Sequence, residues 1–156
     1  MSIQKFKKAM RLAKRCDDYE KGDGVSKSFL DYSEKQLGIT FSPTHRYYLH
    51  KYGDICFSGY ELFGLAENVP ENAPAWGNLL RYTLSERKDN NLPHDWLPIL
   101  SYDDGAMVYL DYSDMIKKEP KIIIRTYNGS TYINNNESFT DMDLGDFTLF
   151  LVEQSL

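Results

Sequence analysis

Apolar side chains recur every three or four residues near the start of the chain, a spacing that is typical of an amphipathic helix. In residues 3–16, lysines and arginines separate the regularly spaced apolar residues Ile3, Phe6, Met10, Ala13 and Cys16. Gly22 and Gly24 then interrupt the pattern. A first helix is therefore expected to end before residue 22.

Two shorter helices are expected next, because the following segment carries residues that suit the ends of helices. Ser28 is a suitable N-cap for the first, and Gly38 can end it in a left-handed conformation. Ser42 and Pro43 favour the start of the second, since proline fits the first turn of a helix without loss of a hydrogen bond. Gly53 is expected to end this helix.

From residue 55 onward the apolar period changes to two, which indicates β-strands. Three hairpins are expected, each with a turn signal between its strands: residues 55–57 and 60–65 around Ser58-Gly59, residues 97–102 and 106–111 around Asp103-Asp104-Gly105, and residues 122–127 and 131–133 around Asn128-Gly129. Helical spacing returns in residues 143–153 and in residues 75–90, the latter through Trp76, Leu79, Leu80, Thr83 and Leu84.

This order of helices, hairpin, helix, two hairpins and helix predicts an α+β fold, with an antiparallel sheet built from hairpins and flanked by helices. The chain has 156 residues, of which 42% are hydrophobic, so it is long enough to bury one core. No repeat or low-complexity linker divides it. A single domain over residues 1–156 is expected, with the helical segment 2–20 as a candidate extension.

Charge is unevenly distributed along the chain, whose formal net charge is -5. Residues 1–21 carry seven basic and three acidic side chains, and the rest of the chain carries 11 basic and 20 acidic ones. The acidic remainder argues against direct binding of nucleic acid, which needs clustered lysines and arginines. It favours a basic protein partner, because complementary fields accelerate encounter. The basic segment is interpreted as a solvated helix face rather than a nucleic-acid or lipid patch.

Cys16 and Cys56 show no pairing pattern, which suits a reducing compartment. No segment has the apolar run of a signal peptide or of a membrane span. The expected location is the cytoplasm, with no membrane partner, and the expected state is a monomer or weak dimer.

Motifs for catalysis or metal binding are not found in the sequence. His45 and His50 are five residues apart, whereas a helical zinc pair needs a spacing of four. Neither a nucleophile elbow nor a phosphate-binding glycine loop occurs. The sequence therefore predicts no cofactor, no bound metal and no enzyme activity.

Four aspartates in the second half of the chain leave three interpretations open: Asp103, Asp104, Asp111 and Asp114. They can serve as turn residues with a solvated edge, as an acidic docking patch, or as a weak Mg²⁺ or Ca²⁺ site, including a catalytic one.

Four motifs follow one another over residues 30–152. The first contains Glu34, Leu37-Gly38, Pro43, Arg46-Tyr47, Tyr48-Leu49 and Gly53, and the later ones are residues 59–64, residues 96–99 leading into 104–111, and the closing Phe147, Phe150 and Leu151. This ordered set resembles the SUKH superfamily, the fold of the yeast cell-wall regulators Smi and Knr and of many bacterial immunity proteins. The chain departs from the family pattern at Ser42, where leucine is usual, and at Asp104-Gly105, where Gly-Asp is frequent.

The resemblance implies a non-catalytic immunity protein that binds a cognate polymorphic toxin, often a nuclease, and blocks it inside the producing cell. The residues that match the family pattern are expected to determine the fold: Leu37, Gly38, Pro43, Tyr48, Leu49, Gly53 and Leu110. Aromatic anchors supply interface energy and charges steer association. The surface that binds the toxin is therefore expected to combine both kinds of residue: Asp54, Tyr60, Glu61, Tyr102, Asp103, Asp104, Tyr109 and Asp111.

Two other functions stay open at this point. One is a regulatory scaffold like the yeast members, which would bind several partners without inhibiting any. The other is a metal-dependent enzyme that uses Asp103, Asp104 and Asp111.

Overall fold

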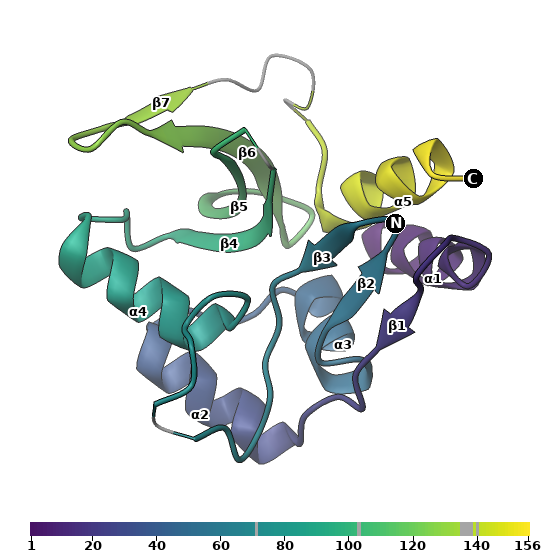
Figure 1. The fold of residues 1–156 in the computed structure, drawn as a ribbon, viewed down its shortest axis with the longest axis horizontal. Coiled ribbons are helices and arrows are strands. Elements are labelled where there is room, and N and C mark those ends of the chain that lie inside the picture. Colours follow the sequence, from purple (N-terminus) through teal and green to yellow (C-terminus); the bar gives the residue numbers. More distant parts are fainter. Residues whose placement is uncertain (71, 103, 135–138, 140) are drawn as a thin grey trace.

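The computed structural model describes the whole chain except residues 71, 103, 135–138 and 140. The described helices are α1 (Ser2–Ala13), α2 (Lys27–Leu37), α3 (Pro43–Lys51), α4 (Leu79–Asp89) and α5 (Leu144–Gln154). The described strands are β1 (Glu20–Lys21), β2 (Ile55–Phe57), β3 (Tyr60–Leu62), β4 (Trp96–Ser101), β5 (Ala106–Ile116), β6 (Glu119–Tyr127) and β7 (Tyr132–Asn134) (Figure 1).

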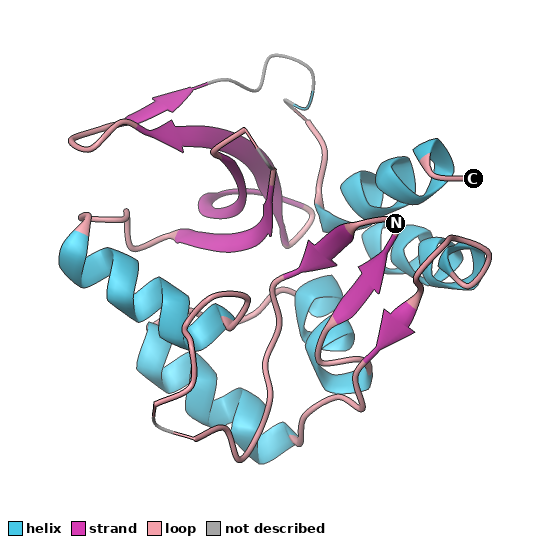
Figure 2. Cartoon of the chain, in the orientation of Figure 1, coloured by secondary structure: helices cyan, strands magenta, loops and turns pink. Residues whose placement is uncertain are grey.

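The strands form two antiparallel sheets, one of order β1-β2-β3 and one of order β4-β5-β6-β7 (Figure 2). The α+β class and the hairpins predicted from the sequence are confirmed. The first hairpin nevertheless belongs to a sheet of its own, which β1 completes at one edge. With only two residues, β1 is too short to show the periodicity of a strand.

A hydrogen bond joins the two sheets where β4 is irregular. The register between β4 and β5 shifts between Pro98 and Leu100. At this bulge the carbonyl of Ile99 accepts a hydrogen bond from the backbone N–H of Phe63 at 2.8 Å. A bulge takes one residue out of the regular ladder, and here that residue binds the segment that follows β3. The small sheet is thereby attached to β4.

The N-terminal helix is part of the core and not a separate extension. Helices α1 and α5 lie against each other (Figure 1), and α1 buries four apolar side chains in the main core, those of Phe6, Ala9, Met10 and Ala13. Gly145 permits the close approach, because a Cβ at this position would overlap the carbonyl oxygen of Ser2. The backbone N–H of Gly145 also donates a hydrogen bond to Ser2 Oγ at 3.0 Å.

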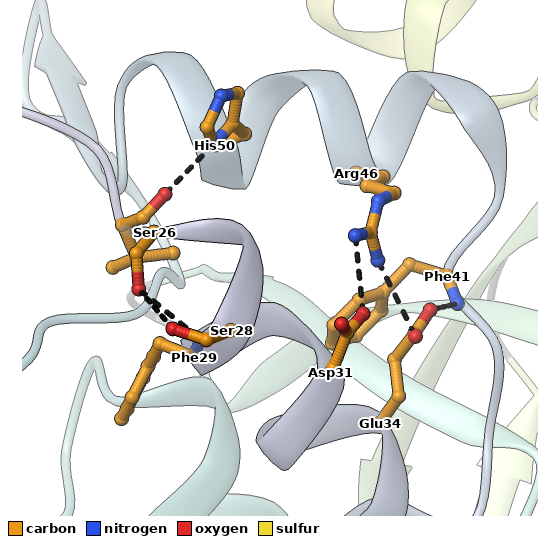
Figure 3. A network of polar contacts seen from close by, with 9 residues as sticks. Ser26, Ser28, Phe29, Asp31, Glu34, Phe41, Arg46 and His50 are labelled. Carbon is orange, nitrogen blue, oxygen red and sulfur yellow. Dashed lines mark hydrogen bonds and ion pairs between the residues drawn. The ribbon is translucent and has the colours of Figure 1, made fainter.

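Charged contacts join α2 to α3 (Figure 3). Arg46 of α3 forms ion pairs with Asp31 and Glu34 of α2, at 3.2 and 3.3 Å. Glu34 also accepts a hydrogen bond from the backbone N–H of Phe41 at 2.7 Å, so this carboxylate connects α2 to the segment that leads into α3. Gly38 ends α2 with a φ of 69°, as the sequence predicts.

Two helix starts differ from the prediction. The N-cap of α2 is Ser26 rather than Ser28, and its hydroxyl accepts a hydrogen bond from the backbone N–H of Phe29 at 3.2 Å. Helix α4 begins only after the N-cap Asn78, so Trp76 precedes the helix. Trp76 lies in the turn before α4, and its ring packs against those of Phe63 and Tyr82. The apolar spacing in the sequence therefore extends beyond the helix itself.

A hairpin between β5 and β6 is an element that the turn signals did not predict. Its turn is Lys117-Lys118, with φ angles of 52° and 69°. Lysine rarely adopts this left-handed conformation, and turns of this kind usually contain asparagine or glycine. Pairing of the two long strands therefore imposes a turn that the local sequence does not favour.

Both faces of β5 are covered by apolar side chains. Val108 and Leu110 belong to the main core, whereas Met107 and Tyr109 point to the other face and join a second, smaller cluster. That cluster also contains Phe63, Leu92 and Ile123, with Tyr82, Trp96 and Tyr132 packed around it. The start of β5 is therefore a continuous apolar run rather than an alternating one.

Candidate functional site

The three-stranded sheet has a buried inner face and an acidic outer face. Its inner face contributes three apolar residues to the main core: Ile55, Phe57 and Leu62. The register places Cys56 of β2 opposite Glu20 of β1 and opposite Glu61 of β3. Because consecutive residues of a strand point to opposite faces, these three side chains share the outer face. We call the surface formed by Glu20, Asp54, Cys56 and Glu61 the acidic face.

Asp54 lies just before β2 and extends this surface. Its carboxylate lies over Gly22, where a Cβ would overlap Oδ1. The backbone N–H of Gly22 donates a hydrogen bond to the carbonyl of Asp54 at 3.0 Å. Partial burial, together with the charge of Glu20, raises the pKa of the Asp54 carboxyl. The carboxylates of this surface therefore repel one another, and a positively charged partner would relieve that repulsion.

The thiol of Cys56 lies among these carboxylates. Burial, followed by the charges of Glu61, Asp54 and Glu20, raises the pKa of the Cys56 thiol to about 11. A thiol with this pKa is protonated at neutral pH, whereas cysteine acts as a nucleophile or metal ligand in its thiolate form. The arrangement attracts cations and suppresses the reactivity of the cysteine.

A hollow of about 140 Å³ adjoins the acidic face at Glu61, lined by Gly59, Glu61, Phe63, Trp76, Gly77 and Ser101. Trp76 is 58% exposed, although its ring contacts those of Phe63 and Tyr82 at centroid distances of 5.4 and 5.5 Å. Exposed tryptophans that are held rigidly are frequent anchors of protein interfaces. The spacing of Trp76 in the sequence predicts a position on the buried face of a helix, whereas its ring precedes α4 and is more than half exposed.

Tyr60, Tyr102 and Asp104 lie where β3 approaches the end of β4. Tyr60 packs against Phe57 with ring centroids 5.8 Å apart, so its ring points away from the acidic face. Burial raises the pKa of Tyr102, with further contributions from Tyr60 and Asp104, so the three side chains are neighbours. Asp104 is exposed and accepts a hydrogen bond from the backbone N–H of Ala106 at 3.0 Å, which closes the turn.

Two of the expected contact residues lie elsewhere. Tyr109 is 2% exposed, and its ring packs against those of Trp96 and Tyr132, so the expectation that it contacts a partner is corrected. The reason is that β5 is covered on both faces. Asp111 lies further along β5 and accepts hydrogen bonds from the backbone N–H and the hydroxyl of Ser113. It is therefore separated from the acidic face.

Asp104 and Asp111, two of the aspartates considered as metal ligands, do not converge. Asp104 precedes β5 and Asp111 is well inside it, so at about 3.3 Å per residue they are roughly 20 Å apart. Asp103 lies outside the described residues. Within the part of the chain that the structure describes, no group of three or more histidine, cysteine, aspartate or glutamate residues could hold a metal ion. Asp104 and Asp111 cannot ligate one ion together.

A SUKH family model with the description SMI1-KNR4 cell-wall matches residues 3–153. The chain belongs to the SUKH family. The match begins in α1 and ends in α5, so both terminal helices are parts of the SUKH domain. No curated protein shows a match to the chain.

The residues that carry the SUKH signature are structural in this protein. Four of them are fully buried: Leu37, Tyr48, Leu49 and Leu110. Gly53 has a φ of 76°, and its carbonyl accepts a hydrogen bond from the backbone N–H of Leu65 at 3.0 Å. The signature therefore specifies the fold, while Glu20 and Trp76 lie outside it. Among the helices of the described residues, none is both long and apolar enough to cross a membrane.

Proposed function

We propose that this SUKH domain is an immunity protein, a non-catalytic domain that neutralises a cognate toxin by direct, stoichiometric binding. Its contact surface is the acidic face together with Trp76, and it extends to Tyr102 and Asp104, which follow Ser101 in the chain; Ser101 lines the same hollow as Trp76. The observation that carries the proposal is the convergence of three carboxylates around Cys56, beside a tryptophan that is more than half exposed. Folding alone does not favour such a cluster, because like charges held together lower stability.

A basic toxin fits this surface best. Nucleases are of this kind, since they need clustered lysines and arginines to bind phosphates. An acidic inhibitor can cover the phosphate-binding surface, and complementary fields raise association rates by about 10- to 1000-fold. The proposal includes a cytoplasmic location, because the toxin has to be neutralised inside the producing cell.

Co-expression with a cognate toxin domain, sought among the genes that neighbour this one, tests the proposal in cells. The acidic-face variant carries Glu20→Lys and Glu61→Lys, two exposed positions whose replacement leaves the core intact. We expect it to lose protection and, with purified toxin domain at low salt, to associate at least about tenfold more slowly than the wild type. Calorimetry on the wild type should give one toxin bound per SUKH domain.

The matched control carries Asp89→Lys and Glu153→Lys, which make the same change in net charge at exposed positions of α4 and α5. Protection by the control and not by the acidic-face variant would support both the function and the surface. Equal protection by the two variants would exclude this surface, and failure of the wild type to protect would exclude the function.

A regulatory scaffold is the second candidate, because the matching family model carries the description SMI1-KNR4 cell-wall. Such a scaffold would bind several proteins without inhibiting any of them. Affinity purification from cell extract separates the candidates: a single dominant basic protein, lost with the acidic-face variant, supports neutralisation, and several proteins retained by both forms support the scaffold.

A further inference from the structure

A second hollow, of about 300 Å³, lies between α1 and α3, and the charged part of its lining is entirely positive. Its polar lining consists of Lys7, Arg11, Lys14, Lys51, Tyr47 and Tyr52. We call it the basic pocket. The chain as a whole has more acidic residues than basic ones, 23 against 18. The lining of this pocket has four basic residues and no acidic one, so its charge is opposite to that of the chain.

The spacing of the basic residues explains how they meet. Lys7, Arg11 and Lys14 are separated by four and three positions, which places them on one side of α1. The apolar residues of α1 occupy the side that faces the core. Lys51 comes from the last turn of α3, which packs against α1. Two helices therefore contribute cations to one hollow.

Tyr47 holds two of these cations close together. The Nζ atoms of Lys7 and Lys51 lie 5.1 and 5.7 Å from the centroid of its ring, within the range in which an aromatic ring attracts a cation. The ring in turn contacts those of Phe6 and Tyr52, at 6.2 and 6.4 Å. Two like charges from different helices are thus held at one ring whose position is fixed by the core.

No carboxylate compensates these charges in the described part of the chain: none of its ion pairs includes Lys7, Arg11, Lys14 or Lys51. Lys5, on another side of the same helix, differs from them because its ammonium group forms an ion pair with Asp146 at 2.6 Å. The lysines and arginine of the basic pocket therefore carry charge that an external anion can neutralise.

We infer that the basic pocket binds a small anion with two or more phosphate-borne charges, such as a diphosphate group. Lysine and arginine are the residues that bind phosphate oxygens, and four cations in one hollow favour an anion of several charges over a monovalent one. The volume of about 300 Å³ corresponds to roughly ten water molecules at about 30 Å³ each, enough for two phosphate groups. The site lies outside the acidic face and does not depend on toxin binding.

Titration calorimetry with inorganic pyrophosphate, at constant ionic strength, tests the inference on the full chain. The wild type should bind one pyrophosphate saturably. The pocket variant carries Lys7→Gln and Arg11→Gln and should bind at least tenfold more weakly. The matched control carries Lys8→Gln and Arg15→Gln, exposed residues of the same N-terminal segment outside the lining, and should bind like the wild type.

Lys51→Gln on α3 gives a second variant that leaves α1 unchanged, and it should also weaken binding. Equal binding by pocket and control variants, or no binding by the wild type at millimolar pyrophosphate, would overturn the inference. Co-sedimentation with vesicles that contain a phosphorylated inositol lipid distinguishes a lipid headgroup from a free phosphate compound. Sedimentation that pyrophosphate displaces would support a headgroup in the same pocket. Calorimetric binding without sedimentation would support a free compound. Sedimentation that pyrophosphate leaves unchanged would exclude a lipid headgroup as the ligand of this pocket.

Discussion

Glu119 accepts hydrogen bonds from Thr44 through a single carboxylate oxygen, at 3.2 Å from the backbone N–H and 3.1 Å from the hydroxyl. Thr44 lies in the first turn of α3, where backbone N–H groups have no partner within the helix. Pro43 has no N–H, and the N–H of His45 donates to Ser42 Oγ at 3.3 Å. A side chain from β6 therefore completes the start of α3 and fastens the helix to the four-stranded sheet.

Loss of this contact should destabilise the whole domain. Glu119→Ala leaves the buried N–H and hydroxyl of Thr44 without an acceptor, which costs about 1–3 kcal/mol for a buried polar group. Glu119→Gln keeps an amide oxygen as acceptor and should lose less. Urea unfolding at pH 7 measures both free energies of unfolding. Equal losses for the two variants would show that the negative charge of Glu119, rather than an acceptor oxygen at this position, determines the effect, because glutamine keeps both the volume and an acceptor.

His45 should make the stability of the domain fall in acid. Its side chain is fully buried, and burial lowers the pKa of its imidazole from 6.5 to about 3. Between these values the unfolded chain binds a proton that the folded chain does not, so stability decreases as the pH falls through this window. The slope approaches about 1.4 kcal/mol per pH unit.

Glu119 has the opposite effect from His45 on how stability depends on pH, and a His45 variant separates the two effects. Burial raises the pKa of the Glu119 carboxyl above 4.5, so the folded state holds its proton longer and stability decreases as the pH rises above that value. In His45→Asn, urea unfolding at successive pH values from 7 to 4 should show a much flatter acid slope. A slope as steep as that of the wild type would exclude His45 as its source.

The acidic face can be tested without its partner through the reactivity of Cys56. A pKa near 11 instead of 9.0 leaves about a hundredfold less thiolate at neutral pH. Alkylation of Cys56 by iodoacetamide, read by peptide mass spectrometry, should therefore be slow and should rise with pH up to about 11. Glu20→Gln with Glu61→Gln should accelerate it severalfold, because charge adds to the effect of burial. A pH profile with a pKa of 9 or below would show that the carboxylates do not surround the thiol.

The helices could be predicted from the sequence more completely than the sheets. Ser42-Pro43 and Gly38 act through local backbone geometry, so they identify a helix start and a helix end without knowledge of the fold. The Lys117-Lys118 turn has no such local signal, since its left-handed conformation is imposed by the pairing of two long strands. Strand pairing between distant segments, including β1 with β2, also has no local signal.

The surface proposed from the structure shares only some residues with the surface expected from the sequence, for a related reason. Asp54 and Glu61 lie around Cys56 because the turn between β2 and β3 brings them together, whereas Tyr60, Tyr102 and Asp104 form a separate group of neighbours. Tyr109 was misplaced, since only the folded chain shows that β5 is buried on both faces. Glu20 was missed because it joins the surface through a strand of two residues. Acidic and aromatic composition predicts a kind of surface, and strand register determines which residues share one face.

Trp76 should contribute more to binding than to folding. Its ring is 58% exposed, so Trp76→Ala is expected to lower the free energy of unfolding by about 1 kcal/mol, from two partly solvated aromatic contacts at about 0.5 kcal/mol each, the lower end of their range. An interface anchor costs about 2 kcal/mol or more of binding free energy when it is replaced by alanine, which is roughly a thirtyfold increase in Kd for the toxin domain.

Tyr32→Ala is the matched control for Trp76→Ala, because Tyr32 is 52% exposed and its ring lies 5.8 Å from that of Phe29 on α2. Urea unfolding and calorimetry with the toxin domain give the two free energies for each variant. We expect similar small losses of stability in both and a large loss of affinity only in Trp76→Ala. Equal affinities for the two variants would remove Trp76 from the contact surface, because an anchor must differ from an equally exposed aromatic residue elsewhere.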